Sequence, residues 1–596
     1  MSEITNYCSL CSLACPVIFR GGKRGPIFSK DSILTIDWDT REESKYGGSL
    51  CARGNAAVEF VSHPKRINYP FVLGERTGID AAVKETAKSL SAIKNKSGGE
   101  KIGVLIGENL TNEEAALALK FAREVIGTSK VELFAPDDTP LFRSWLGCDL
   151  SGLSPSTEKP SGTRQVFLMI GDSFSEHPCT AKPVLAAKNS GRGNEIIVIS
   201  PEISHTAWFA GRHLRCRPGG EAAVVAGILK SVAQTTANGL VPELKKLMDG
   251  IEWNDIERLG GVKKDAIESA ATSILGAVNI ETYVSNIFGR FAMPGLVSLF
   301  AEALTAICPG DSKFDAQFVQ QNSWGIYSVL AAGETTPFLS KLEGDEVEAL
   351  VILGLDIFSA YPAGPIENAL REKKFTVASQ MFFGQTASRA NVVIPAACLM
   401  EKKGTVSPSF GEDLVREDVI DPPGGVLTDG EFLVALAREM GSDLSGSVDV
   451  VRKTSRGSSG EGVVADWTAF SNTIRGLDAS DLVLIPWSEA VHVADGSTSR
   501  NLHWSEVTCP EPRLYVSKEI MDKLDLTEND LVRVSSEGGE TMLPVEATEK
   551  LQGGTVAATI HFPSVRKLFP WKLDDRRGEV LLAPVPVNLD SQSEKS

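Results

Sequence analysis

Short apolar runs alternate with longer amphipathic stretches along most of the chain from about residue 71 onward. Residues 101–107 form an apolar run that ends in glycine, and residues 111–125 follow with helical periodicity. Thr111 and Glu114 have the spacing of a capping box at the start of that helix. Further strand-like runs lie at 131–135, 165–170 and 195–200. This alternation predicts an α/β fold with doubly wound, mainly parallel sheets.

One strand–turn–helix pattern occurs twice. Residues 168–178 and 352–362 each contain an apolar run, a glycine, an aspartate, Phe-Ser and a proline. The repeat predicts two related lobes within residues 71–470, and insertion of one lobe in the other at about 131–335 is one arrangement that it allows. Ligands of open α/β sheets bind beyond the carboxyl ends of the strands, so the two turns are candidate ligand sites. Chance recurrence of a common turn is the alternative.

The two ends of the chain have a different texture. Residues 1–70 are rich in Cys, Gly and Arg and predict a small separate domain. Residues 453–464 are polar and rich in Gly and Ser, as in a linker. Short apolar runs broken by Gly and Pro over 480–590 predict a compact β-barrel domain with one short helix at 519–524. We expect residues 590–596 to be disordered.

Composition narrows the classes of function. Of 596 residues, 42% are hydrophobic, and the formal net charge is −17, which argues against a nucleic-acid-binding protein. No run approaches the roughly 20 apolar residues that span a bilayer, so no membrane span is expected. The N-terminus has no export signal, and we expect a cytoplasmic location.

The placement of the cysteines is the strongest chemical signal. Cys8, Cys11 and Cys15 lie close together and Cys51 follows at a distance. Three closely spaced thiolates and a distant fourth suit a [4Fe–4S] cluster. Zinc is the competing interpretation, although zinc ribbons usually have two separate Cys-x2-Cys pairs, and unrelated thiols are a third. The remaining cysteines have apolar or turn contexts typical of structural residues: Cys148, Cys179, Cys216, Cys308, Cys398 and Cys509.

These cysteines also carry a family resemblance. Together with the segments 51–54 (Cys-Ala-Arg-Gly) and 60–67 (Phe-Val-x-His-Pro-x-Arg-Ile), they closely resemble the N-terminal domain of molybdopterin oxidoreductases. That family includes formate dehydrogenases, nitrate reductases, formylmethanofuran dehydrogenase and the large iron–sulfur subunit of respiratory complex I. Other segments resemble the family in the same order along the chain, at 171–178, 197–202, 217–221, 321–325, 392–405 and 511–570.

The resemblance implies a bis(molybdopterin guanine dinucleotide) cofactor with Mo or W between the two lobes. It also implies that Arg53 lies on the electron path between the cluster and the pterin. Iron–sulfur and flavin-containing subunits of a larger redox complex are the implied partners. The implied cofactor-binding residues are Gly171, Asp172, His177, Ser200, Glu202, Arg217, Gly219, Asn322, Gly354, Asp356, Glu401 and Gly404.

The sequence departs from the family where formate dehydrogenases place a metal-binding Cys or selenocysteine followed by His. Asp137 and Asp138 lie in that region, and either is a candidate metal ligand or acid–base group; a surface turn is the alternative. Ser200, Glu202, Ser407 and residues 410–412 also differ from the family pattern. Three functions follow: a catalytic Mo or W redox subunit, a non-catalytic electron-transfer scaffold resembling complex I, or a hydratase-type reaction at an aspartate.

Overall fold

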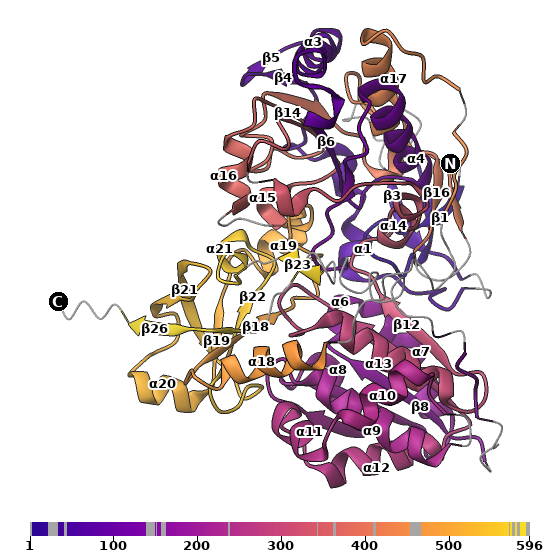
Figure 1. The fold of residues 1–596 in the computed structure, drawn as a ribbon, viewed down its shortest axis with the longest axis vertical. Helices are drawn as coiled ribbons and strands as arrows, with labels where there is room; N and C mark the ends of the chain where they lie inside the picture. The colour runs from indigo at the N-terminus through magenta and orange to yellow at the C-terminus, as the bar shows by residue number, and fades with distance from the viewer. Residues whose placement is uncertain are drawn as a thin grey trace. The chain divides into compact units, whose positions relative to one another are not determined.

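The chain passes repeatedly between two folding units. Unit 1 comprises Met1–Ala135, Phe318–Thr454 and Val491–Pro510, and unit 2 comprises Pro136–Gln317, Ser455–Ala490 and Glu511–Ser596. In Figure 1 the ribbon is coloured by residue number from indigo to yellow, so these segments can be traced along the chain.

The structure is a computed structural model, and each unit is described by itself. The described residues are 3–21, 34–40, 44–138, 150, 152–156, 162–236, 239–342, 344–360, 365–408, 413–446, 448–452, 466–570, 573–574, 579–580 and 584–591. The whole predicted linker at 453–464 lies outside them, as do residues 410–412, residues 361–362 and Cys148.

Unit 1 begins with a small antiparallel sheet of three strands in the order β1-β2-β3. The strands are β1 (Glu3–Tyr7), β2 (Pro16–Arg20) and β3 (Thr35–Trp38). The loop between β1 and β2 carries the first three cysteines, and the fourth immediately precedes α1 (Ala52–Ala56).

A seven-stranded sheet forms the centre of unit 1, in the order β5-β4-β15-β14-β13-β6-β7. Its β6, β7, β13, β14 and β15 pair in parallel. All residues of β6 are buried, as expected for a strand covered on both faces. The strand bounds are β4 Phe71–Val72, β5 Glu75–Arg76, β6 Ile102–Ile106, β7 Val131–Leu133, β13 Ala349–Leu353, β14 Phe375–Gln380 and β15 Val392–Pro395.

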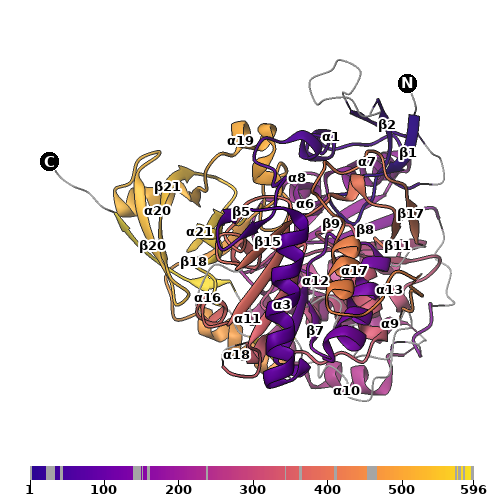
Figure 2. The same cartoon turned by 90° about the horizontal axis from the view of Figure 1, so that it is seen from above.

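The longer helices of unit 1 are α3 (Ile79–Ser97), α4 (Asn112–Lys120), α14 (Ser323–Ala332) and α17 (Asp429–Glu439). The predicted capping box of Thr111 and Glu114 starts α4, and a π-helical segment over Phe121–Ile126 continues it. Figure 2 shows the length of α3 beside α17, and these two helices pack together. The remaining elements of unit 1 are α2 (Glu59–Ser62), α15 (Ile357–Ala360), α16 (Pro365–Arg371), β16 (Gly404–Val406), β17 (Leu414–Arg416) and α19 (His503–Thr508).

Unit 2 contains a second sheet, of five parallel strands in the order β10-β9-β8-β11-β12. Its strands are β8 (Gln165–Ile170), β9 (Glu195–Ser200), β10 (Arg212–Arg215), β11 (Asn279–Ser285) and β12 (Lys313–Gln317). The buried helix α9 (Glu221–Thr235) packs against α11 (Trp253–Gly260), α12 (Lys264–Leu275) and α13 (Pro294–Ile307). The other helices of this region are α6 (Ser173–Glu176), α7 (Ala181–Ser190), α8 (His205–Trp208) and α10 (Pro242–Gly250).

The C-terminal part of unit 2 is a seven-stranded mixed sheet in the order β25-β18-β22-β19-β21-β20-β26. It is a curled sheet with edge strands β25 and β26, in the region where a β-barrel domain was predicted. The short predicted helix is α20 (Lys518–Leu524), and residues 588–591 form β26, so the expected disorder does not begin at 590. The remaining bounds are α18 Trp467–Leu477, β18 Val483–Trp487, β19 Leu514–Val516, β20 Leu531–Ser535, β21 Glu540–Ala547, β22 Thr555–Thr559, α21 Pro563–Arg566, β23 Leu573–Asp574, β24 Glu579–Val580, β25 Val585–Pro586 and β26 Asn588–Ser591.

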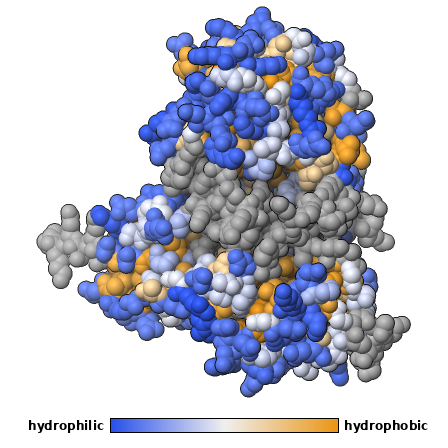
Figure 3. Space-filling model, viewed as in Figure 1, coloured by the Kyte–Doolittle hydropathy of each residue, from blue (hydrophilic) through white to orange (hydrophobic). Residues whose placement is uncertain are grey.

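The prediction of an α/β fold is therefore confirmed. Figure 3 shows a face on which hydrophilic side chains predominate around smaller hydrophobic areas. Among the described residues, no helix has both the length and the apolar character needed to cross a bilayer.

Candidate metal centre and ligand-binding turns

The loop between β1 and β2 closes on itself through its backbone. The N–H of Cys8 donates to the carbonyl of Cys15 at 2.8 Å, and the N–H of Ala14 donates to the carbonyl of Cys11 at 3.1 Å. Ala14 has a left-handed φ of 42°, which tightens the turn. The three cysteines are buried on this one loop.

Helix α1 brings Cys51 to the same place. Cys51 is the N-cap of α1, and the N–H of Gly54 points at its Sγ at 3.4 Å. A Cβ on Gly54 would lie 3.3 Å from the Sγ of Cys8 and 2.8 Å from Leu50, so glycine permits the close approach. Burial, together with the neighbouring Cys51 and Cys11, raises the pKa of Cys8 to about 12. This mutual effect indicates that these thiols are neighbours.

A buried arginine faces these thiols. Arg53 is 2% exposed, and its Nη1 donates to the carbonyl of His492 at 2.6 Å. Burial acts to lower the pKa of Arg53, but the thiolate forms of Cys51 and Cys11 would attract its charge, and overall its pKa is raised. The positive charge predicted between cluster and pterin is therefore held against the cysteines.

Two further residues anchor the loop by hydrogen bonds: Arg416, which the sequence did not indicate, and Gln321, in the segment 321–325. Arg416, 1% exposed, donates through Nη1 to the carbonyl of Tyr7 at 2.7 Å and to Gln321 Oε1 at 3.1 Å. The side-chain amide of Gln321 in turn donates to the carbonyl of Cys8. Because both residues lie more than 300 positions away, only the folded chain brings them to the loop.

In the described part of the chain, no three or more His, Cys, Asp or Glu side chains form the ligand group of one metal ion. Zinc draws its four ligands to a single ion, whereas a [4Fe–4S] cluster spreads four thiolates over its corners. Ligation by the four cysteines stays a prediction.

The turn after β8 in unit 2 is held by an aspartate and a threonine. Asp172 accepts hydrogen bonds from the Thr206 N–H at 3.0 Å and from its hydroxyl at 2.7 Å. The N–H of Phe174 donates to the same hydroxyl at 2.9 Å. Gly171 has a φ of +93°, and a Cβ there would lie 2.2 Å from the Ser285 carbonyl oxygen, so packing against β11 requires glycine.

Next to this turn lies a buried charge network. Arg290 donates through Nη2 to Glu176 at 2.9 Å and through Nη1 to Glu202 at 2.8 Å. Ser488 also donates to Glu176 at 3.0 Å. Burial raises the pKa of Glu176, although Arg290 opposes the shift. Arg290, Glu202 and Asp172 are among the residues that line a cavity of about 10 Å³, roughly the space of one water.

Glu221, the first residue of α9, is a buried carboxylate of a different kind. Both of its carboxylate oxygens lack a hydrogen-bond partner among the described residues. Burial raises its pKa to about 8. Such a group is costly unless a donor reaches it.

The other predicted residues of unit 2 have internal contacts. Ser200 donates to the Glu202 carbonyl at 2.8 Å, and Arg217 forms an ion pair with Asp478. Gly219 has a φ of +77°, and His177 is buried at the end of α6. The structure thus brings Asp172 and Glu202 to one cavity, whereas Arg217 pairs at a partly exposed position.

Unit 1 has a matching turn after β13. Asp356 accepts from the Thr386 N–H at 3.0 Å and from its hydroxyl at 2.7 Å. The N–H of Phe358 donates to that hydroxyl at 3.3 Å. Gly354 has a φ of +62°. The repeat seen in the sequence is therefore a repeat of hydrogen bonds as well.

Three more predicted residues of unit 1 make contacts within the protein. Asn322 donates to the Leu110 carbonyl at 2.7 Å and accepts from the Ser407 N–H at 2.8 Å. Glu401 forms a buried two-fold ion pair with Arg66, at 2.7 and 2.5 Å. A Cβ on Gly404 would lie 2.5 Å from Glu113 Oε2.

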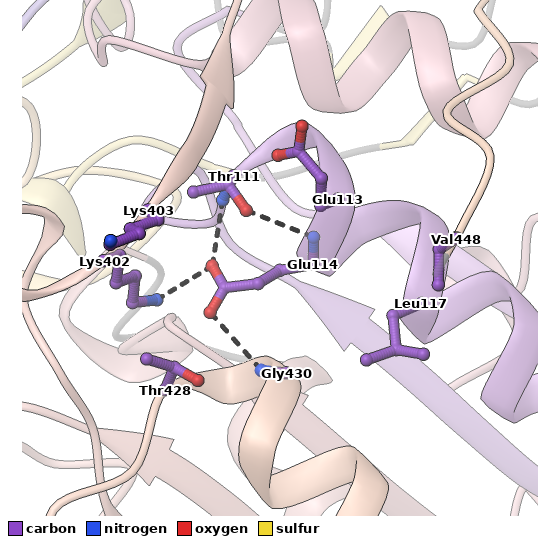
Figure 4. A pocket seen from close by; sticks show the side chains of 9 residues that line it. All are labelled: Thr111, Glu113, Glu114, Leu117, Lys402, Lys403, Thr428, Gly430 and Val448. Atoms are coloured by element: carbon purple, nitrogen blue, oxygen red, sulfur yellow. Dashed lines mark hydrogen bonds and ion pairs between the residues drawn. The ribbon is translucent and has the colours of Figure 1, made fainter. Parts of the chain in front are cut away.

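A buried cation also links two helix starts in unit 1 (Figure 4). Lys402 Nζ lies 3.0 Å from Glu114 Oε2 and 2.7 Å from Asp429 Oδ2. Glu114 caps α4 and accepts from the Gly430 N–H in α17 at 3.3 Å. The adjacent cavity of about 170 Å³ is lined by Thr111, Glu113, Glu114, Leu117, Lys402, Lys403, Thr428, Gly430 and Val448.

Comparison with known proteins adds the family. Residues 80–439 match the family described as "Molybdopterin oxidoreductase", which is more than half of the chain. This chain belongs to the molybdopterin oxidoreductase family. Residues 482–581 match a second family, the "Molydopterin dinucleotide binding domain".

Relatives of this chain match most of its length. The F420-dependent formate dehydrogenase subunit alpha of Methanocaldococcus jannaschii is 21% identical, over 94% of each chain. An NADH-quinone oxidoreductase subunit of Rhizobium meliloti is 23% identical, over 95% of this chain and 71% of the relative. In fold the chain resembles the acetylene hydratase of Pelobacter acetylenicus, with a TM-score of 0.74, 15% identity, and coverage of 98% of this chain and 100% of the other.

The candidate aspartates are not on a surface turn. Asp137 is 4% and Asp138 0% exposed. Asp137 pairs with Arg566 Nη2 at 3.0 Å and accepts from the Phe288 N–H at 2.6 Å. The surface-turn alternative is therefore wrong, because Arg566, 429 residues away, supplies the charge that lets Asp137 be buried.

The residues around the turn after β8 fit one end of a pterin guanine dinucleotide better than the other. A guanine base offers adjacent N–H donors, and the carboxylate of Glu221 lacks donors. A diphosphate is anionic, whereas Asp172, Glu176 and Glu202 surround one arginine with negative charge. The donor set thus suits the base and disfavours bare phosphates beside Arg290.

Proposed function

We propose that this chain is the electron-transferring subunit of a multi-subunit redox complex. It carries a [4Fe–4S] cluster on Cys8, Cys11, Cys15 and Cys51, with Arg53 on the electron path. The observation that carries the proposal is the approach of α1 to the cysteine loop, which sets Cys51 and Arg53 against Cys8 and Cys11. Buried thiols beside a buried cation favour a ligated, negatively charged group.

We further propose that the chain binds molybdopterin guanine dinucleotide with Mo or W. The match to the dinucleotide-binding domain and the unpartnered carboxylate of Glu221 support this step. Glu221 would bind the guanine base, and Asp172 and Asp356 would keep the turns of the two lobes in shape. When bound, the metal–pterin group would exchange electrons with a small substrate. Formate is the substrate suggested by the names of the formate dehydrogenase relatives.

A second candidate is a scaffold that relays electrons without Mo or W. The ion pair between Asp137 and Arg566 favours it, because a carboxylate that neutralises a buried arginine is not free to ligate a metal. The relative named as an NADH-quinone oxidoreductase subunit is consistent with such a role. Either candidate requires partner subunits, for which iron–sulfur and flavin proteins are the proposed class.

Metal and pterin analysis of the anaerobically purified complex tests both candidates. We expect about four irons per chain, together with Mo or W and released guanine nucleotide if the first candidate holds. Iron without Mo, W or pterin would leave the scaffold. Parent protein without iron would overturn the cluster and both candidates.

A matched pair of cysteine variants locates the iron. Cys15→Ser should lose most of the iron and its visible absorbance, because a hydroxyl replaces a cluster thiolate. Cys308→Ser is the control, since Cys308 is fully buried in unit 2 at the end of α13. Equal iron in both variants would contradict the ligand assignment.

A further inference from the structure

Arg416 is a buried cation whose hydrogen bonds all reach neutral oxygens. It donates to the carbonyls of Tyr7 and Leu399 and to the side-chain oxygen of Gln321, at 2.7, 3.4 and 3.1 Å. Its Nε has no partner, and among the described residues no carboxylate forms an ion pair with it. An isolated buried charge of this kind is expensive.

Four other buried cations among the described residues form ion pairs with carboxylates. Arg66 pairs with Glu401, and Lys402 pairs with Glu114 and Asp429. Arg290 and Arg566 have their own carboxylates in unit 2. Arg416 differs from all four.

Two cysteines, in their ionised form, are the groups that attract the charge of Arg416. Burial lowers the pKa of Arg416 to about 10, and the thiols of Cys8 and Cys398 oppose that shift. Cys8 is also reached through the backbone, because Arg416 holds Tyr7 and its partner Gln321 holds the Cys8 carbonyl. Arg416 therefore fixes one end of the cysteine loop and places its charge there.

We propose that Arg416 is a positioning residue for Cys8 and, in addition to Arg53, a second counter-charge of the thiolate-bound cluster, and that it raises the reduction potential of that cluster. The inference rests on the proposed function, since it requires the cluster to be present. A cluster bound by four thiolates is negative, and it becomes more negative when one electron enters. A fixed cation at the loop stabilises the reduced state more than the oxidised state, which favours uptake of that electron.

The test is an anaerobic redox titration of the full chain, with dithionite as the electron donor and the EPR signal of the reduced cluster as the readout. In Arg416→Gln we expect about tenfold less reduced cluster at a fixed potential, equivalent to a shift of about 59 mV for one electron. Arg416→Lys keeps the charge and should shift the reduced fraction by less than about threefold. Arg123→Gln, an exposed arginine of the same unit, should match the parent.

A second variant covers the case in which Arg416→Gln does not fold. Gln321→Glu leaves Arg416 in place but gives it a carboxylate, so the reduced fraction should again fall. An iron-loaded Arg416→Gln or Gln321→Glu protein with the parent's potential would overturn the proposal. Parent protein without iron would instead overturn the proposed function itself.

Discussion

The two lobes share one turn and differ in the charges around it. After β8 in unit 2 and after β13 in unit 1, an aspartate accepts the N–H and the hydroxyl of a threonine from the next strand's loop. Counting from those aspartates and threonines, Glu176 corresponds to Ala360, and Glu202 corresponds to Phe382. Unit 2 therefore has a buried acid–arginine network where unit 1 has apolar side chains.

This difference separates the hydrogen bonds that shape the turn from the charged groups that could bind a ligand. The Asp–Thr bonds shape the turn in both lobes and need no ligand to explain them. The buried charges of unit 2 have no counterpart at the matching positions of unit 1. We infer that the two turns present different chemistry to any ligand that binds at the strand ends.

The largest expected effect comes from breaking the unit 2 network. Arg290→Gln leaves Glu176 and Glu202 buried without their cation, which should destabilise unit 2 by about 3–5 kcal/mol. Hydrogen exchange of peptides from residues 165–317 should show the loss, with unit 1 peptides less affected. Arg192→Gln, an exposed arginine of the same lobe, is the control. A loss below about 1 kcal/mol would mean that solvent already reaches these carboxylates.

The next effect is a pH dependence confined to unit 2. Burial raises the pKa of Glu221 from 4.5 to about 8, so the folded state binds a proton that the unfolded state has lost. Stability from this group is therefore complete below about pH 4.5 and falls as the pH rises through 8. Glu221→Gln should remove this loss, gaining about 2–4 kcal/mol on the parent between pH 5 and pH 8. Unfolding measured at both pH values checks it, with exposed Glu243→Gln as control. If the stability of Glu221→Gln changed with pH in the same way as that of the parent, Glu221 would not be the group that holds the proton.

The smallest effect tests what the lobes share. Thr206→Val and Thr386→Val each remove a hydroxyl that donates to an aspartate and accepts from a phenylalanine N–H. Each should cost about 1–3 kcal/mol in its own unit, because buried partners are left unsatisfied. Local hydrogen exchange measures both. A large loss of stability in one unit and none in the other would mean that the shared turn does not stabilise the two units equally.

The fold was predictable where the signal is local. The strands at 165–170 and 195–200 have the predicted bounds because fully buried parallel strands are continuous apolar runs. The start of α4 was predictable because a capping box lies within four residues. The curled sheet in the predicted barrel region could not be foreseen in this form, because the order of its strands depends on pairings that no short segment encodes.

The candidate sites divide in the same way. The cysteine spacing, Arg53 and the repeated Gly-Asp turns are visible as short motifs. Arg416, Arg290 and Arg566 were missed because each acts on a segment more than 80 residues away, with no local pattern around it. For the same reason the burial of Asp137 could not be foreseen. The roles of the predicted pterin-binding residues stay predictions.

The cysteine loop is held by residues that lie far along the chain, and this affects when the loop can fold during synthesis. Cys8 is synthesised more than 300 residues before Gln321 and Arg416, which hold its loop, and Arg53 is synthesised more than 400 residues before His492, whose carbonyl accepts its hydrogen bond. In a nascent chain the four cysteines therefore lack these stabilising hydrogen bonds until Gln321 and Arg416 have been synthesised. Whatever the cysteines bind must be delivered after residue 416 has emerged and folded back, or be chaperoned until then.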